Sequence, residues 1–87
     1  MKKKAKADNN SPAFEARVGS VRVSVWKNAS EAGAVYFNTT IERRYRDTDN
    51  EWKASTSFTG YGDCVLAAAA LDLAREFLKL QELGQDA

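Results

Sequence analysis

The chain has 87 residues, of which 44% are hydrophobic and 29% are charged, and its formal net charge at pH 7 is +1. A chain of this length makes one small domain, and it lacks the apolar run of about 18 residues that would predict a transmembrane helix. It contains no histidine and a single cysteine, Cys64. This composition excludes an internal disulfide, the usual zinc sites and nucleophile pairs that depend on histidine. We therefore expect no metal, no cofactor and no enzymatic activity, and we expect a cytoplasmic protein because a lone cysteine is typical of reducing compartments.

The positive charge is concentrated near residue 1. Residues 1–8 contain four lysines and one aspartate, which gives +3, so the remaining nine Lys/Arg and eleven Asp/Glu give the rest of the chain −2. We expect residues 1–13 to form a disordered basic tail, because they hold too few apolar groups to bury. No apolar core follows the lysines as it would in a secretory signal. The tail is either a solvated leader or an arm that contacts phosphates, and residues 14–87 are expected to form the single domain.

The first extended segment is predicted over Phe14–Trp26, where valines alternate with polar or aromatic residues with period two. Gly19 is predicted to bend this segment and to divide it into a short strand and a longer one. The polar stretch Lys27–Gly33 is predicted to be a loop.

Two further strands, Ala34–Arg46 and Glu51–Phe58, are predicted on either side of the turn-forming residues Asp47–Asn50. Both are rich in aromatic, β-branched and hydroxyl residues, which is typical of antiparallel pairs. Pairing across the turn is predicted to place Trp52 on the same side as Ile41. The face that the helix covers is then predicted to carry Val35, Phe37, Ile41, Trp52 and Phe58.

A long amphipathic helix is predicted from Cys64 to about Leu83, with Asp63 as its N-cap and Gly84 as its stop. Its main apolar stripe is predicted to consist of Leu66, Ala70, Leu73, Phe77 and Leu80. Three more apolar residues widen the stripe and predict a second contact, with another subunit or with the first strand: Val65, Ala69 and Leu83. The whole pattern predicts an α+β fold, in which a three- or four-stranded antiparallel sheet is covered on one face by a single C-terminal helix. So small a core favours a homodimer.

The sheet face opposite the helix is the predicted functional surface, because it combines cations, aromatic rings and hydroxyl or amide donors. The candidate binding residues are Arg22, Trp26, Tyr36, Asn38, Arg44, Arg46, Lys53 and Ser55. Unstacked bases of a single strand lie on aromatic rings, while cations and short polar side chains contact phosphate and sugar oxygens. Two other interpretations stay open, a plain solvated sheet face and a surface that binds a protein partner or a second copy.

The run YRDTDNEWKASTSF, which is followed by the long amphipathic helix, resembles the core of the single-stranded-DNA-binding family that includes positive cofactor four and the Whirly proteins. The resemblance covers residues 21–80, and Ser55–Phe58 stands where that family carries a Lys-Gly-Ile-Ser type of segment. It implies a curved antiparallel sheet followed by a helix, and a dimer of the positive-cofactor-four type. The predicted function is binding of single-stranded nucleic acid, DNA rather than RNA, with low sequence specificity. The alternative is a protein–protein interaction or dimerisation module with no nucleic-acid role.

Overall fold

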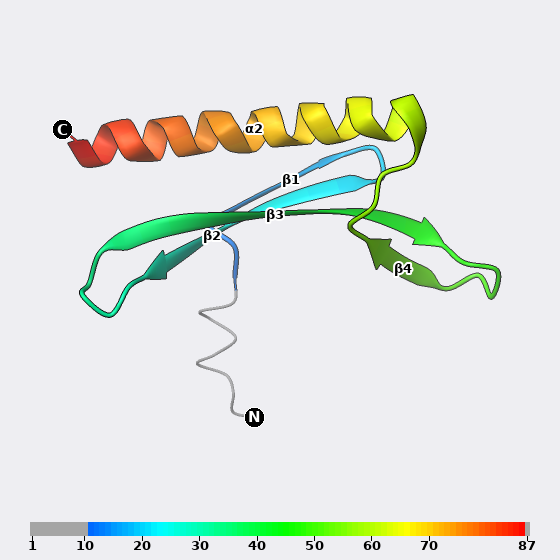
Figure 1. Cartoon of the computed structure of the whole chain (residues 1–87), viewed down its shortest axis with the longest axis horizontal. Coiled ribbons are helices and arrows are strands. Elements are labelled where there is room, and N and C mark those ends of the chain that lie inside the picture. The colour runs from blue at the N-terminus through cyan, green and yellow to red at the C-terminus, as the bar shows by residue number, and fades with distance from the viewer. Residues whose placement is uncertain (1–10, 87) are drawn as a thin grey trace.

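The computed structural model describes residues 11–86, with side chains described as far as residue 83. Four strands form one antiparallel sheet in the order β1-β2-β3-β4, and the helix α2 lies over one face of it (Figure 1). The elements are β1 (Phe14–Val18), β2 (Val21–Ala29), β3 (Val35–Arg46), β4 (Trp52–Ser55) and α2 (Gly60–Asp86). The predicted α+β class is confirmed, with four strands. Of the predicted tail, residues 1–10 lie outside the described residues.

A two-residue turn at Gly19 joins β1 to β2 and confirms the predicted division of the first segment. Gly19 has φ +60, a left-handed conformation that side chains with a Cβ rarely adopt. A Cβ at this position would also lie 3.1 Å from Cδ1 of Leu66 on α2. Glycine therefore allows both the tight turn and the close approach of the helix.

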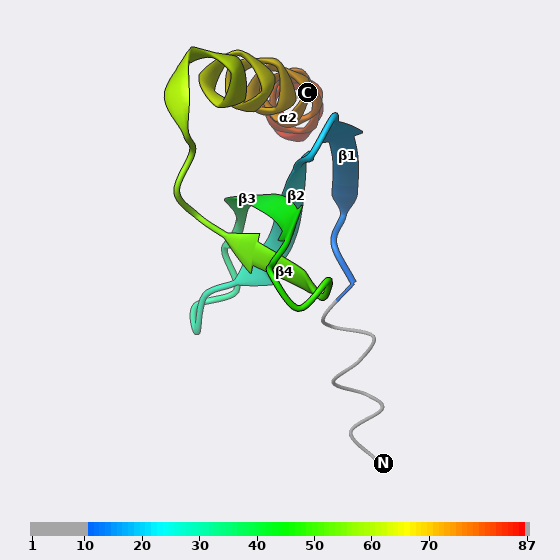
Figure 2. The same cartoon turned by 90° about the vertical axis from the view of Figure 1, so that its right-hand side faces the viewer.

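The core lies between α2 and the β1–β2 half of the sheet, and Figure 2 shows the helix above these two strands. The fully enclosed hydrophobic residues of the described chain are small: Val21, Val23, Val25, Ala70 and Ala74. Phe77 packs against this core, stacked on Phe14 with ring centroids 4.9 Å apart and edge-on to Phe37 at 6.2 Å. Because alanines form the buried centre of the helix face, the helix backbone lies close to the sheet.

The helix differs from its prediction at both ends and in its rotation. It begins at Gly60, and Asp63 is not the N-cap: its carboxylate lies in the first turn, accepts the backbone N–H of Thr59 at 2.8 Å and contacts Arg43 Nε at 3.3 Å. Gly84 does not stop the helix, which continues to Asp86. Of the predicted stripe, Leu73 and Leu80 are 45% and 68% exposed, while Ala74 and Leu78 face the core instead.

The hairpin between β3 and β4 has a register one residue away from the predicted one. Five residues connect the strands, so Arg46 lies opposite Trp52, and Asn50 adopts φ 63 within the turn. Side chains alternate between the faces of a strand, so a one-residue slip moves all of them to the other face. Trp52 is therefore not a core residue and is 57% exposed. Val35, also predicted to face the helix as part of the core, is 43% exposed.

Candidate nucleic-acid interface

The sheet face that points away from α2 is polar and is built from alternate residues of all four strands. The cross-strand register places Arg17 opposite Arg22 and Arg22 opposite Glu42 on this face. Further along β3, Arg44 and Arg46 lie on the same face as Glu42, because side chains two residues apart in a strand point to the same side. The face therefore contains a strand-crossing row of charges that ends at the β3–β4 hairpin.

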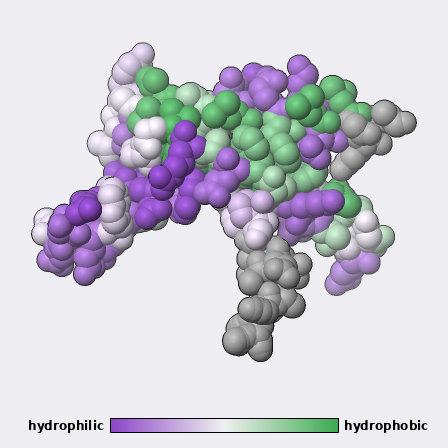
Figure 3. Space-filling view, turned by 180° about the vertical axis from the view of Figure 1, so that it is seen from behind, coloured by the Kyte–Doolittle hydropathy of each residue, from purple (hydrophilic) through white to green (hydrophobic). Residues whose placement is uncertain are grey.

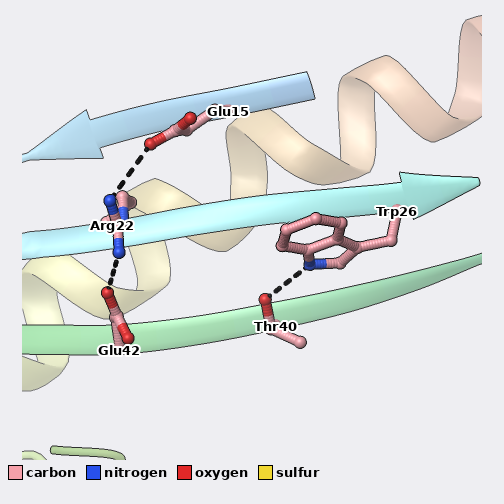
Figure 4. A network of polar contacts seen from close by, with 5 residues as sticks. All are labelled: Glu15, Arg22, Trp26, Thr40 and Glu42. Carbon is pink, nitrogen blue, oxygen red and sulfur yellow. Dashed lines mark hydrogen bonds and ion pairs between the residues drawn. The ribbon is translucent and has the colours of Figure 1, made fainter. Parts of the chain in front are cut away.

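Arg22 is held inside a network of ion pairs at the middle of this face (Figure 4). Its guanidinium contacts Glu15 Oε2 at 3.4 Å on β1 and Glu42 Oε2 on β3. These carboxylates offset its charge, and its side chain is only one-third exposed. Arg22, a predicted phosphate contact, is therefore engaged within the sheet and is a weak anchor for a ligand.

Trp26 is also hydrogen-bonded within the sheet. Its indole Nε1–H donates to Oγ1 of Thr40 on the neighbouring strand at 2.9 Å, and its side chain is half-buried (Figure 4). Asn38 lies directly opposite Trp26, and Tyr36, which is 47% exposed, follows toward the start of β3. A shallow hollow of about 160 Å³ borders Trp26 and Arg22. This end of the face keeps the three predicted residues Trp26, Tyr36 and Asn38 together.

The other end of the face carries a group of basic and aromatic side chains, which we call the arginine–tryptophan cluster: Arg17, Arg44, Arg46 and Trp52. All are exposed except Arg44, which is half-buried. The guanidinium carbons of Arg44 and Arg46 lie 5.8 Å and 4.9 Å from the centre of the Trp52 ring. Such cation–π contacts orient the ring and the two charges relative to each other. Trp52 keeps more than half of its surface exposed, so part of the ring is accessible to a ligand.

A hollow of about 420 Å³ lies within this cluster, lined by Arg17, Gly19, Ser20, Arg44 and Trp52. The backbone N–H of Arg44 donates to the carbonyl of Ser20 at 2.8 Å, which fixes the β1–β2 turn against β3 and closes one side of the hollow. No carboxylate lines it. Within residues 11–83, neither Arg17, Arg44 nor Arg46 forms an ion pair. The hollow thus presents cations that no described acid offsets.

Lys53 and Ser55 lie on the opposite side of the hairpin from the cluster, so the prediction that they share the open face is wrong. Their cross-strand partners are Tyr45 and Arg43, which are on the helix side of β3. Lys53 Nζ instead contacts Asp47 Oδ2 at 3.4 Å. Hydrogen bonds from the backbone N–H groups of Glu51 and Asp49, together with Lys53, lower the pKa of Asp47 below its usual 3.8.

Sequence reasoning missed Arg17 and Trp52 as members of the site. Arg17 alternates with inward-facing Ala16 and Val18, so its outward direction was readable from the period-two pattern of β1. The sheet face on which Trp52 lies could not be inferred from the sequence, because it depends on the length and conformation of the turn. The structure therefore separates the eight predicted residues into three groups. At the Trp26 end, Arg22 and Trp26 are engaged within the sheet while Tyr36 and Asn38 are exposed. Arg44 and Arg46 lie beside Trp52, and Lys53 and Ser55 lie on the other face.

No three His, Cys, Asp or Glu side chains between residues 11 and 83 gather as they would around a metal ion, and no buried side-chain polar atom there lacks a hydrogen-bond partner. The helix α2 is too polar for its length to cross a bilayer.

Comparisons of the chain with protein-family models, with curated proteins and with solved structures found no match. The resemblance to the positive-cofactor-four and Whirly family accordingly stays a prediction from the sequence.

Proposed function

We propose that the chain binds single-stranded nucleic acid, DNA in preference to RNA, on the open sheet face, with the arginine–tryptophan cluster as the anchor. The observation that supports this most is the exposed Trp52 ring flanked by arginines that no described carboxylate neutralises. A base stacks on an exposed indole ring, and each such contact contributes about 1–3 kcal/mol. Arg44 and Arg46, whose guanidinium groups lie over this ring, would supply cations for the phosphates of the same strand.

The shape of the surface favours a single strand over a duplex. A duplex keeps its bases stacked, so their flat faces cannot lie on Trp52. The preference is carried by the stacking surface and not by the width of the sheet, because Arg44, Arg46 and Trp52 lie on the two-stranded β3–β4 hairpin. Contacts made through stacking and phosphates carry little sequence information, so we propose low sequence specificity.

The test is fluorescence anisotropy of a labelled single-stranded oligonucleotide of about 20 nucleotides at low salt. The variant Arg44→Ala/Arg46→Ala removes two phosphate contacts, and we expect binding to weaken at least tenfold while the fold is kept, since neither side chain contributes to the core. The logarithmic salt slope is expected to fall by about 0.7 for each phosphate that the variant no longer neutralises.

Lys53→Ala is the matched control, because Lys53 belongs to the same hairpin but faces the other side. It is expected to leave binding within about twofold of wild type, because its ammonium is on the other side of the hairpin and is paired with Asp47 Oδ2 at 3.4 Å. Absence of binding by the wild type at micromolar protein contradicts the proposal. Equal losses in the Lys53 control and the double variant contradict the placement of the site.

A further inference from the structure

The long strand β3 is paired along the whole of one edge but along only part of the other. On one side β2 pairs with residues 35–43, whereas on the other side β4 pairs with residues 43–46 alone. Figure 1 shows β4 beside the last part of β3, close to the start of α2. In the described part of the chain, residues 35–40 therefore have one edge without a neighbouring strand.

The hydrogen-bond pattern of the β2–β3 pair shows which groups this open edge presents. The backbone N–H of Arg44 donates to the carbonyl of Ser20 at 2.8 Å. In an antiparallel pair, residues that bond to one neighbouring strand alternate with residues that point their backbone groups away from it. The residues that direct their N–H and C=O groups at the open edge are therefore Val35, Phe37 and Thr39.

A groove of about 440 Å³ lies between this edge and α2. It is lined by Thr39 on the strand and by Leu71, Ala74 and Leu78 on the helix, with charged residues at its rim. Thr39 is exposed although Val25, directly opposite it on β2, is fully buried. The helix thus covers β2 and stops short of β3, as Figure 2 shows. Neighbouring strands lie about 4.8 Å apart, so a strand added at the open edge has its inward side chains in this groove.

The opposite edge of the sheet lacks this combination. The strand there, β1, has five residues, includes the charged Glu15 and Arg17, and follows Pro12. Short length, charge and proline are features with which proteins protect a free edge. Figure 3 views the molecule from the β1 side and shows hydrophilic surface beside the hydrophobic surface of the helix. Residues 35–41 of β3, VYFNTTI, contain no charge, proline or glycine, so this is the edge suited to receive a strand.

Two charged residues at the rim of the groove describe the partner further. Lys79 and Glu82 both line the groove and are exposed, and within residues 11–83 neither forms an ion pair. The third charged residue, Arg75, contacts Asp72 at 2.6 Å and Glu76 at 3.4 Å. Charge complementarity therefore requires an acid beside Lys79 and a base beside Glu82.

We propose that the open edge of β3 binds an extended segment of a partner protein, which adds a strand to the sheet antiparallel to β3, as β4 already is on the same edge. The segment has apolar side chains at alternate positions toward the groove. Figure 1 shows α2 running opposite to β3, so the acid for Lys79 precedes the base for Glu82 in the segment. Backbone hydrogen bonds supply the affinity and the groove supplies the specificity.

The edge strand of a second copy fits this site less well, because residues 35–41 are uncharged and supply neither the acid nor the base. The site is also separate from the arginine–tryptophan cluster, and peptide binding does not depend on nucleic-acid binding.

The test is selection on the full chain from a phage-displayed library of random peptides of about twelve residues, enough for one strand. We expect the enriched peptides to share the alternating apolar pattern with the acid before the base. Fluorescence anisotropy of the labelled peptides is expected to give a Kd below about 100 µM.

Two leucine variants locate the site. Leu71→Glu places a charge in the groove and is expected to weaken peptide binding at least about tenfold. Leu73→Glu is the matched control, the same change at a leucine that is 45% exposed, against 44% for Leu71, on the other flank of α2. It is expected to leave binding within about twofold, and circular dichroism confirms that both variants fold.

N-methylation of the peptide tests the backbone pairing. In an antiparallel pair the groove-facing residues of the peptide donate their N–H groups to β3. Methylation of these nitrogens is expected to abolish binding, whereas methylation of the alternate, outward-facing residues is expected to leave it within about threefold. The exchange Lys79→Glu/Glu82→Lys is expected to weaken binding about two- to tenfold, and a peptide with its acid and base exchanged is expected to restore it.

Absence of any enriched peptide with a Kd below about 100 µM overturns the proposal. Equal effects of the two leucine variants or of the two sets of methylations also overturn it, as does failure of the exchanged peptide to restore affinity. Peptide binding that converts a dimeric chain into monomers in sedimentation equilibrium would show that a second copy occupies the edge, and this result overturns the proposal too.

Discussion

The middle of the outer sheet face and its hairpin end are made of similar residues that make different contacts. In the middle of the sheet Arg22 is paired with Glu15 and Glu42, and Trp26 donates to Thr40. At the hairpin end Arg44 and Arg46 lie over Trp52, Arg46 also donates to Asn50 Oδ1, and neither pairs with a described carboxylate. Where neighbouring strands supply acids and hydroxyls, the polar groups satisfy one another. Where β3 extends past β2 into the hairpin, there are fewer neighbours, and the charges stay available to a ligand.

The largest expected effect is the loss of single-strand affinity when Trp52 is replaced, compared with the loss when Trp26 is replaced. Trp52→Ala removes the exposed stacking surface, so we expect single-strand affinity to fall by about 5- to 150-fold, the equivalent of 1–3 kcal/mol. Trp26→Ala is the matched comparison and is expected to weaken binding less, because that ring is half-buried and hydrogen-bonded within the sheet. Anisotropy titrations of both variants give the ratio, and a larger loss for Trp26→Ala would place the main contact at the other end of the face.

A smaller effect is expected at Arg22, and on stability more than on binding. Arg22→Ala leaves Glu15 and Glu42 on neighbouring strands without the cation between them. We expect the free energy of unfolding to fall by about 1 kcal/mol, the upper range for partly exposed ion pairs, and binding to change by less than threefold, about 0.6 kcal/mol. Urea unfolding and anisotropy measure the two. A tenfold loss of binding with unchanged stability would show that Arg22 acts on the ligand.

The smallest expected effect concerns the turn that positions Trp52. The folded-state pKa of Asp47 is lowered below 3.8, because its carboxylate accepts backbone N–H groups of Glu51 and Asp49. Because the pKa of Asp47 is lower in the folded chain than in the unfolded chain, its carboxylate stabilises the turn fully at a pH above the unfolded-state pKa. This stabilisation is lost as the pH falls through the folded-state pKa. NMR titration of the Asp49 and Glu51 amides is expected to show a transition below pH 3.8, and one above it would contradict the assignment.

The order of the elements and the polar sheet face opposite the helix could be predicted from the sequence. The face on which Trp52 lies and the rotation of α2 about its own axis could not. Alternating valines identify β2, and Gly19 identifies the first turn, because both are local signals. The face of Trp52 was mispredicted because α2 does not reach β4, so neither face of that strand has a core to select it. The rotation of the helix was mispredicted because alanines, not the larger leucines, occupy the closest contact with the sheet.

The most direct test of the account is NMR mapping of a single-stranded oligonucleotide onto the backbone amides of the wild-type chain. We predict the largest shift changes at the β1–β2 turn near Ser20 and on the hairpin at Arg44, Arg46 and Trp52, with smaller ones around Arg22. Shift changes centred on α2, or none at saturating oligonucleotide, would contradict the claim that the hairpin end of the sheet binds the strand.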